Sequence, residues 1–198
     1  MIWKIVAAAL LLQAVPRSPV VVPDGMHAYS MPSQSMQPTI FEGEVFLADR
    51  RGDDCGSTQP ALGDVVIIDR ERTPYVKRVV AGPRQRVQMK AGVLIVDDIP
   101  VLQVEVGVQD MAFGLPATVI QETLPNGATY LTWDYGPDSQ FDNFGPIIVP
   151  EASWFTLGDN RDNSIDGREF GPTPTSDLCG TAVRIVQSTD PKRVGMRP

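Results

Sequence analysis

The chain has 198 residues, which is enough for one sizeable hydrophobic core or two small ones, and its content of 42% apolar and 21% charged residues is that of a globular protein. The formal net charge is −7 and there is a single histidine. Binding to nucleic acid depends on clustered Lys and Arg side chains that neutralise phosphates. We therefore expect a folded protein that does not bind nucleic acid.

The N-terminal segment, "MIWKIVAAALLLQAVP", has one lysine followed by an apolar run at residues 5–15 that only Gln13 interrupts. As a helix this run would span about 15 to 22 Å, less than the ~30 Å hydrocarbon core of a bilayer. Three alternatives stay open: a signal peptide that is removed, a short anchor with Lys4 on the cytoplasmic side, and a buried core helix. We expect residues 1–15 to be an anchor or signal segment, and the proline-rich residues 16–25 to be a linker.

The remainder of the chain has the pattern of a β protein. Its 18 prolines and 17 glycines divide it into short segments rich in Val, Ile and Thr. We expect strands at residues 43–49, 64–70, 75–81, 85–89, 92–96, 101–106, 117–122, 128–133, 146–149, 153–157 and 180–187. The predicted fold class is all-β or mainly β.

The order of the predicted strands also suggests a domain organisation. We expect a β core made of residues 26–96 and 151–187, with a smaller β subdomain, residues 97–150, inserted between them. Residues 188–198 form a short tail. The two cysteines, Cys55 and Cys179, are too far apart in the sequence for a CxxC pair or a zinc knuckle. Whether they form a disulfide stays open and depends on export to an oxidising compartment.

Three serines stand in the stretch "SMPSQSMQPTI", residues 30–40, and Ser35 needs a base if it is to act as a nucleophile. In an extended chain His27 would lie about 26 Å from Ser35, so a Ser-His-Asp triad would require the chain to double back, and we expect His27 to be at the surface or partly packed. The remaining candidates are the four lysines, Lys4, Lys77, Lys90 and Lys192. Lys4 belongs to the N-terminal segment and Lys192 to the tail.

Lys77 lies in the middle of the predicted strand "TPYVKRVVAG", on the same face as Tyr75 and Val79, while Arg78 points to the other face. A lysine among apolar neighbours loses solvation of its ammonium group, and this lowers its pKa. A lowered pKa would make Lys77 a usable base near neutral pH. Exposed lysines are the rule, so strand parity alone leaves a solvent-exposed Lys77 open as the alternative.

A third segment, "LGDNRDNSIDGREFGP" at residues 157–172, is dense in charged residues and asparagines. A calcium loop would need a glutamate six positions after Gly167, where the chain has Thr173, so we expect no metal here. The alternative is a rigid, hydrogen-bonded loop in which carboxylates pair with Arg161 and Arg168. Such rigidity suits the wall of an active site.

The segments "PSQSMQPTI", "GDVVIID…YVKRVVAG" and "GDNRDNSIDGREFGP" follow one another in an order that resembles the bacterial type I signal peptidases, or leader peptidases. The resemblance implies a membrane-bound serine endopeptidase with a Ser/Lys dyad, no cofactor, and an all-β catalytic core with an inserted β subdomain. It implies a monomer at the inner membrane, with its catalytic domain on the periplasmic side. The expected partners are membrane lipid and the signal peptides of exported preproteins, which such enzymes cleave after small residues in an A-x-A pattern.

Carried over by position, Ser35 would be the nucleophile and Lys77 the general base. Ser33 would contribute its hydroxyl to the oxyanion hole, and Ser164 would hydrogen-bond Lys77 and orient it. The resemblance also implies structural roles and a substrate pocket for further residues. The structural supports would be Asp159, Asp166 and Arg168, with Asp159 pairing with Arg78 and Asp166 with Arg168, and the pocket wall would come from Met31, Pro32, Met36, Ile40, Tyr75 and Val76.

The sequence departs from the family's usual motifs at two places in the core. The lysine motif usually continues as "AGPGD", where this chain has "AGPRQ" at residues 81–85, and the last motif usually reads "DSR", where this chain has Asp166, Gly167 and Arg168. Two alternative functions therefore stay open. One is a specialised maturation peptidase of the same fold for a pilin-like or conjugation protein, and the other is a catalytically silent β module that binds export substrates.

Overall fold

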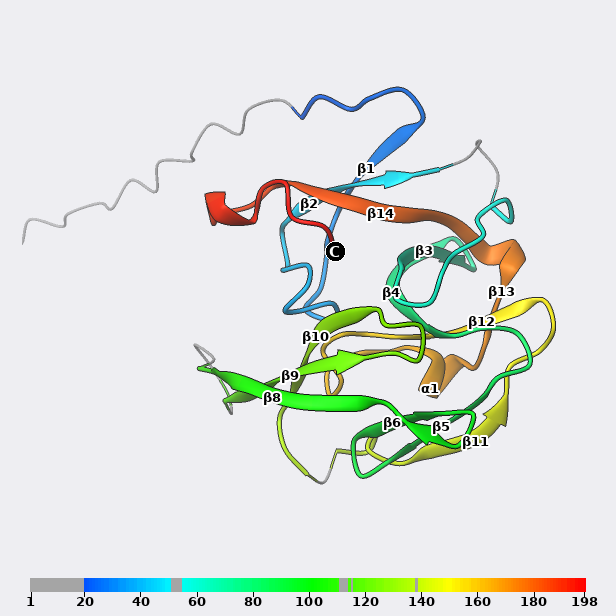
Figure 1. Cartoon of the computed structure of the whole chain (residues 1–198). Helices are drawn as coiled ribbons and strands as arrows, with labels where there is room; N and C mark the ends of the chain where they lie inside the picture. Colours follow the sequence, from blue (N-terminus) through cyan, green and yellow to red (C-terminus); the bar gives the residue numbers. More distant parts are fainter. Residues whose placement is uncertain (1–19, 51–54, 111–113, 115, 138) are drawn as a thin grey trace, which may run out of the picture.

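The computed structural model of the chain describes residues 20–50, 55–110, 114, 116–137 and 139–198. Within these ranges the regular secondary structure consists almost entirely of β-strands, arranged in three sheets (Figure 1). The mainly β fold class predicted from the sequence is therefore confirmed. The predicted anchor or signal segment, residues 1–15, lies outside the described residues.

The largest sheet has seven strands in the order β1-β2-β14-β3-β4-β12-β13. Their bounds are Met26–Ser30 for β1, Val45–Asp49 for β2, Leu178–Gln187 for β14, Val65–Arg70 for β3, Thr73–Ala81 for β4, Ser153–Leu157 for β12 and Thr173–Pro174 for β13. All neighbouring strands are antiparallel. The order places strands from the beginning, the middle and the end of the chain side by side.

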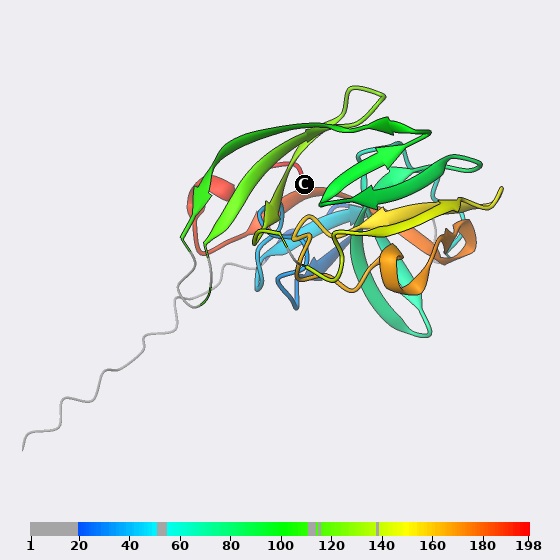
Figure 2. The ribbon, with the colours of Figure 1, turned by 90° about the horizontal axis from the view of Figure 1, so that it is seen from below.

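A second sheet has the order β10-β9-β8, with bounds Thr129–Asp134, Ala117–Thr123 and Leu102–Gln109, and a third has the order β11-β5-β6-β7, with bounds Phe144–Ile148, Arg86–Lys90, Val93–Val96 and Ile99–Pro100. Figure 2 shows these strands along one side of the molecule. β11 comes from the predicted insertion yet pairs with β5 of the predicted core. The division into a core and a subdomain with a boundary at residue 97 stays a prediction.

Each of the eleven strands expected from the sequence is present, with ends that differ by a few residues. Three strands were missed: β1, which precedes the serine-rich stretch, and the two-residue strands β7 and β13. Helices are short: α1 spans Gly167–Phe170, and two 3-10 helices, η1 and η2, span Thr175–Asp177 and Pro191–Arg193. In the described ranges, no helix is both long and apolar enough to cross a membrane.

Strand β4 lies at the centre of the hydrophobic packing. Val76 belongs to one buried cluster with Phe46 and Ile67, Val79 to a second with Ile68, and Val80 to a third, larger cluster. Because both faces of β4 are covered, every residue of the strand from position 76 to position 81 is buried. Strand parity therefore does not separate an exposed face from a core face here.

The two cysteines, whose pairing the sequence left open, form a disulfide between Cys55 and Cys179. Cys179 is the second residue of β14 and is itself buried against the cluster that contains Val76. The bond fixes the segment that follows β2 to the start of the strand beside it.

Candidate active site

The serine and the lysine singled out from the sequence meet in the structure. The Lys77 amine donates a hydrogen bond to the Ser35 hydroxyl, with 2.8 Å between Nζ and Oγ. Lys77 is 3% exposed and Ser35 is 8% exposed. The two residues are 42 positions apart in the chain, so the contact is made by the fold and not by local sequence.

Local structure explains how Ser35 reaches this position. β1 ends at Ser30, and the chain then turns, with backbone hydrogen bonds from the Gln37 N–H to Gln34 and from the Ile40 N–H to Met36. These turns bring Ser35 down onto β4 beside Lys77. The extended arrangement of residues 27–35 that the sequence analysis considered therefore ends early, and His27 is exposed on β1, as expected.

Burial changes the acidity of Lys77. Loss of solvation lowers the pKa of its ammonium group from the usual 10.5 to about 8, although the carboxylates of Asp166 and Asp159 partly oppose the shift. No ion pair to Lys77 is present in the described part of the chain. A neutral amine at hydrogen-bond distance from a hydroxyl can accept its proton, which is the geometry that general-base catalysis requires.

Ser33 and Ser164, the other two serines of the predicted site, differ in their hydrogen bonds. The Ser33 hydroxyl donates to the Ser35 hydroxyl over 3.2 Å, and Ser33 is exposed. Ser164 is buried, but its hydroxyl oxygen has no hydrogen-bond partner in the described residues. The predicted hydrogen bond from Ser164 to Lys77 is therefore not formed in this structure, and the Ser164 side chain packs closely against Gly158.

Gly158 is the point of closest packing between the charged loop and the serine loop. A Cβ at this position would overlap the side chain of Ser164 and lie 2.6 Å from the carbonyl oxygen of Ser35. Only glycine allows backbone to approach this closely. Gly158 therefore lets the loop of residues 158–166 sit directly against the candidate nucleophile.

Two predicted ion pairs support this loop. The Arg78 guanidinium donates to both carboxylate oxygens of Asp159, over 2.8 and 2.6 Å. The Arg168 guanidinium donates to both oxygens of Asp166, over 2.9 and 2.8 Å, and the same carboxylate caps the start of α1 through the Arg168 N–H. Both pairs are buried, so the predictions of Asp159 with Arg78 and of Asp166 with Arg168 are confirmed.

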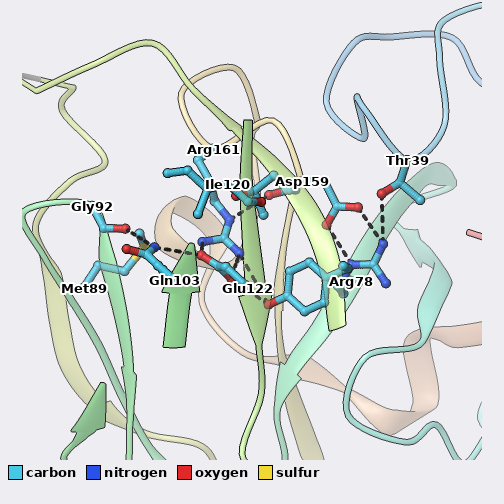
Figure 3. Close-up of polar contacts among 12 residues, drawn as sticks. Thr39, Arg78, Met89, Gly92, Gln103, Ile120, Glu122, Asp159 and Arg161 are labelled. Carbon is cyan, nitrogen blue, oxygen red and sulfur yellow. Dashed lines mark hydrogen bonds and ion pairs between the residues drawn. The ribbon is translucent and has the colours of Figure 1, made fainter. Parts of the chain in front are cut away.

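A third ion pair in the same loop was missed. Arg161 donates to both oxygens of Glu122 over 2.6 Å, and the Tyr130 hydroxyl donates to Glu122 over 2.8 Å (Figure 3). Glu122 lies on β9, so this pair joins the loop to the three-stranded sheet. The composition of the loop predicts a carboxylate partner for Arg161, but nothing in the sequence connects Arg161 with a glutamate 39 positions earlier.

The predicted substrate-pocket residues divide into two groups. Met31, Met36, Ile40 and Val76 belong to one buried cluster, and Met36 and Ile40 have no exposed surface. A side chain without exposed surface cannot itself form the wall of an open pocket, so Met36 and Ile40 lie behind any such wall. Pro32 is exposed and Tyr75 is half-buried against the ring of Phe170. The assignment of a pocket to these residues stays a prediction.

No separate ligand set for a metal is evident in the described ranges. The one cluster of suitable side chains there is Cys55, Asp69 and Cys179, and its two sulfur atoms are bonded to each other. In the loop once considered for calcium, Asp159 and Asp166 bind arginines, and Asp162 accepts the Tyr135 N–H over 2.6 Å.

The two departures from the usual motifs both have a structural setting. Arg84 adopts a left-handed backbone, with φ of 66°, at the place where the usual motif has glycine. The turn is nevertheless closed, because the Gln85 side chain accepts the Gly82 N–H over 2.8 Å. At Gly167 a Cβ would lie 2.7 Å from the Thr156 carbonyl oxygen and 2.9 Å from the ring of Phe155. The serine usual at this position has no room here.

Comparison with known proteins identifies the family of the chain. The family described as "Signal peptidase, peptidase S26" matches residues 2–187. The chain belongs to this family. Its relatives include "Signal peptidase I" of Rickettsia typhi, with 32% identity over 163 residues, covering 76% of this chain and 57% of the relative. The protein of the same name from Rickettsia canadensis is 29% identical over 223 residues, covering 94% of this chain and 79% of the relative.

The chain spans little more than half the length of several of these relatives, for example 52% of a "Signal peptidase I" from Rickettsia bellii. Among solved structures, the crystal structure of a signal peptidase I from Enterococcus faecalis is 18% identical, covers 63% of this chain and 97% of that chain, and superimposes with a TM-score of 0.39. This likeness is too low to support an argument about the fold. Membership of the family rests on the sequence match.

Proposed function

We propose that this chain is a serine endopeptidase that removes signal peptides from exported preproteins, with Ser35 as nucleophile and Lys77 as general base. The observation that carries the proposal is the 2.8 Å contact between the Lys77 amine and the Ser35 hydroxyl, with Lys77 buried. Membership of the signal peptidase family supports the same reaction and the same class of substrate.

In the proposed reaction the neutral Lys77 amine takes the proton of the Ser35 hydroxyl as its oxygen attacks the scissile carbonyl. The Ser35 N–H and the Ser33 hydroxyl stabilise the oxyanion that forms. The Lys77 ammonium then protonates the leaving amine, which yields an acyl-enzyme and the new N-terminus of the mature protein. Lys77 next activates a water molecule that hydrolyses the ester, releases the signal peptide and restores Ser35.

Specificity for small residues is part of the proposal. Met31 and Val76, each buried to more than nine-tenths, lie in one cluster close to the Ser35 loop. Bulky side chains at such a site narrow it, so that Ala, Gly or Ser at the −1 and −3 positions fits and larger residues do not. Met36 and Ile40 would stiffen the site from behind.

We further propose that the enzyme works at the inner membrane, with its catalytic domain on the extracytoplasmic side. The apolar run at residues 5–15 would anchor it there as a monomer, and the disulfide between Cys55 and Cys179 is of the kind that persists in oxidising compartments.

The test is cleavage of a preprotein with an A-x-A signal peptide by the purified full chain in detergent, compared with a Ser35→Ala variant. Wild type should cleave at the junction, with a rate that rises with pH, is half-maximal near the Lys77 pKa of about 8, and levels off at higher pH, where Lys77 is fully neutral. Ser35→Ala should be inactive. Ser30→Ala, which changes an exposed serine of β1, is the matched control and should cleave like wild type.

Other outcomes separate the rival functions. Equal inertness of wild type and Ser35→Ala toward all preproteins would favour a silent binding module. Cleavage confined to a pilin-like or conjugation protein would favour the specialised maturation peptidase.

A further inference from the structure

Asn160 lies between the serine loop and the three-stranded sheet and is fully buried. Its side-chain Nδ2 donates to the carbonyl oxygen of Gln34 over 3.3 Å and to the hydroxyl of Tyr135 over 3.0 Å. Its backbone N–H donates to the carbonyl oxygen of Ser35 over 3.2 Å. A single residue therefore contacts both peptide groups that flank the Ser35 Cα.

The contact with Gln34 has a consequence for Ser35. The Gln34 carbonyl and the Ser35 N–H belong to the same planar, trans peptide group, so they point in opposite directions. When Asn160 fixes the carbonyl, it also fixes the direction of the N–H. In the described part of the chain the Ser35 N–H has no acceptor of its own, so it is available to a ligand.

Asn160 is itself rigidly held. The Trp133 N–H donates to Asp159 and the Arg161 N–H donates to Trp133, each over 2.9 Å, so the residues on both sides of Asn160 are hydrogen-bonded to the end of β10. The side chains of the same two neighbours form the buried ion pairs with Arg78 and Glu122 (Figure 3). The backbone hydrogen bonds and the buried ion pairs of its two neighbours therefore hold Asn160 in place.

We propose that Asn160 is a positioning residue that aims the Ser35 N–H at the oxyanion, and that Tyr135, from the segment following β10, holds the Asn160 amide in place. This inference rests on the proposed function, because the oxyanion forms only if Ser35 attacks a carbonyl. It gives the three-stranded sheet a part in the reaction, since Tyr135 directly follows the last strand of that sheet.

The test is the Asn160→Ala variant, which removes the side-chain amide and keeps the backbone N–H that donates to Ser35. Complete loss of one oxyanion-hole donor lowers kcat by about 10²- to 10³-fold in other hydrolases. A Ser35 N–H that is present but misdirected should lose part of this stabilisation of the oxyanion, so we expect kcat to fall by about 10- to 100-fold. KM should stay within about twofold, because substrate binding does not depend on the oxyanion. The pH of half-maximal rate should stay near the wild-type value, because the contact of Lys77 with Ser35 is kept.

Two further variants provide the matched comparison. Asn163 also donates to Gln34, over 3.4 Å, but to the side chain and not to the backbone. Asn163→Ala should therefore keep wild-type kcat within about twofold. Tyr135→Phe removes only the hydroxyl that accepts from Asn160 and should lower kcat by about two- to fivefold. If Asn160→Ala does not fold, the kcat of Tyr135→Phe is compared with that of Asn163→Ala, and equal values would overturn the inference.

The results distinguish the inference from the function on which it rests. An inactive wild type would remove the proposed function itself. Active wild type and inactive Ser35→Ala, together with full kcat in Asn160→Ala, would overturn the inference alone. A loss in Asn160→Ala that came through a higher KM or a shifted pH profile would also overturn it, because the residue would then act on substrate binding or on Lys77.

Discussion

Strand β4 carries two neighbouring cationic side chains, one on each face, which are equally buried and yet have pKa values shifted in opposite directions. Lys77 and Arg78 are each 3% exposed. On one face Arg78 is bound by both oxygens of Asp159, and on the other face Lys77 donates to the hydroxyl of Ser35 and has no ion-pair partner among the described residues. Desolvation acts on both groups, but the pKa of Arg78 is raised by its carboxylate partner, whereas the pKa of Lys77 falls to about 8.

The comparison shows that the partner, and not burial alone, decides the charge state of a buried cation. A charge that leaves water without an opposing charge is destabilised, and a paired one is not. One face of β4 thus holds a permanent cation that fixes the charged loop, while the other holds an amine that is readily neutral. The same strand supplies the support of the site and its proposed base.

The largest expected effect comes from the Lys77 face. Lys77→Met should lower cleavage of a preprotein by about 10⁴-fold or more, as loss of one member of a catalytic unit does. The side chains have similar volume, so the fold should be kept. Initial rates from product analysis on gels, with circular dichroism as the check on folding, measure this. Retained turnover in the folded variant would remove Lys77 from the mechanism.

The same variant also tests the electrostatic comparison. The pKa of Lys77 is lower in the folded than in the unfolded chain, so the unfolded chain binds more protons between pH 8 and about 10.4. The free energy of unfolding of wild type therefore increases as the pH rises through that range. Below pH 8 wild type bears the full free-energy cost of burying the Lys77 ammonium group, so Lys77→Met should be the more stable protein. Urea unfolding of both proteins should show that the difference narrows at pH 10. A difference independent of pH would contradict the lowered pKa.

On the Arg78 face, Asp159→Ala leaves a buried guanidinium without its partner. We expect the free energy of unfolding to fall by about 3 to 5 kcal/mol, as for other broken buried pairs. Glu151→Ala is the matched control, because Glu151 pairs with Arg84 in full solvent and such pairs contribute at most about 1 kcal/mol. Similar losses in the two variants, measured by chemical unfolding, would show that burial of the Arg78 pair has no special effect.

The smallest effect concerns Gly167, the first residue of α1, which directly follows the charged loop. Gly167→Ser restores the residue usual in related motifs, but its Cβ would meet the Thr156 carbonyl and the Phe155 ring. We expect a loss of about 1 to 3 kcal/mol in unfolding free energy, typical of an overpacked core. Thermal unfolding measures it. A neutral substitution would mean that Phe155 can move aside.

Much of the fold followed from local sequence. Segments such as residues 64–70 and 75–81 combine β-branched residues with flanking turn residues, and both form strands. Strand β1 escaped notice because its sequence, "MHAYS", has neither β-branched residues nor an apolar alternation. At the candidate site, Ser35 and Lys77 were found by eliminating other bases and by resemblance to a family, not by predicting their contact.

The sequence did not predict contacts that depend on how strands are ordered and packed in the folded chain. Glu122 lies near the end of strand β9, and only the packing of β9 against the charged loop brings it to Arg161. The close approach of Gly158 to the side chain of Ser164 likewise depends on the folded arrangement of the two residues, which no pattern of residue types encodes. Strand parity correctly predicted opposite faces for Lys77 and Arg78, but it did not predict that Arg78 is buried too, because both faces of β4 are covered.

The disulfide encloses the chain from position 55 to position 179, and this covalent ring contains Lys77 but not Ser35. In the chain-entropy account, closing a ring of this size stabilises the folded state by on the order of 4 to 5 kcal/mol. That is comparable with the whole net stability of many domains, about 5 to 15 kcal/mol. A chain with free thiols would lose this contribution, so the ring that contains Lys77 would be less stable than in the oxidised chain.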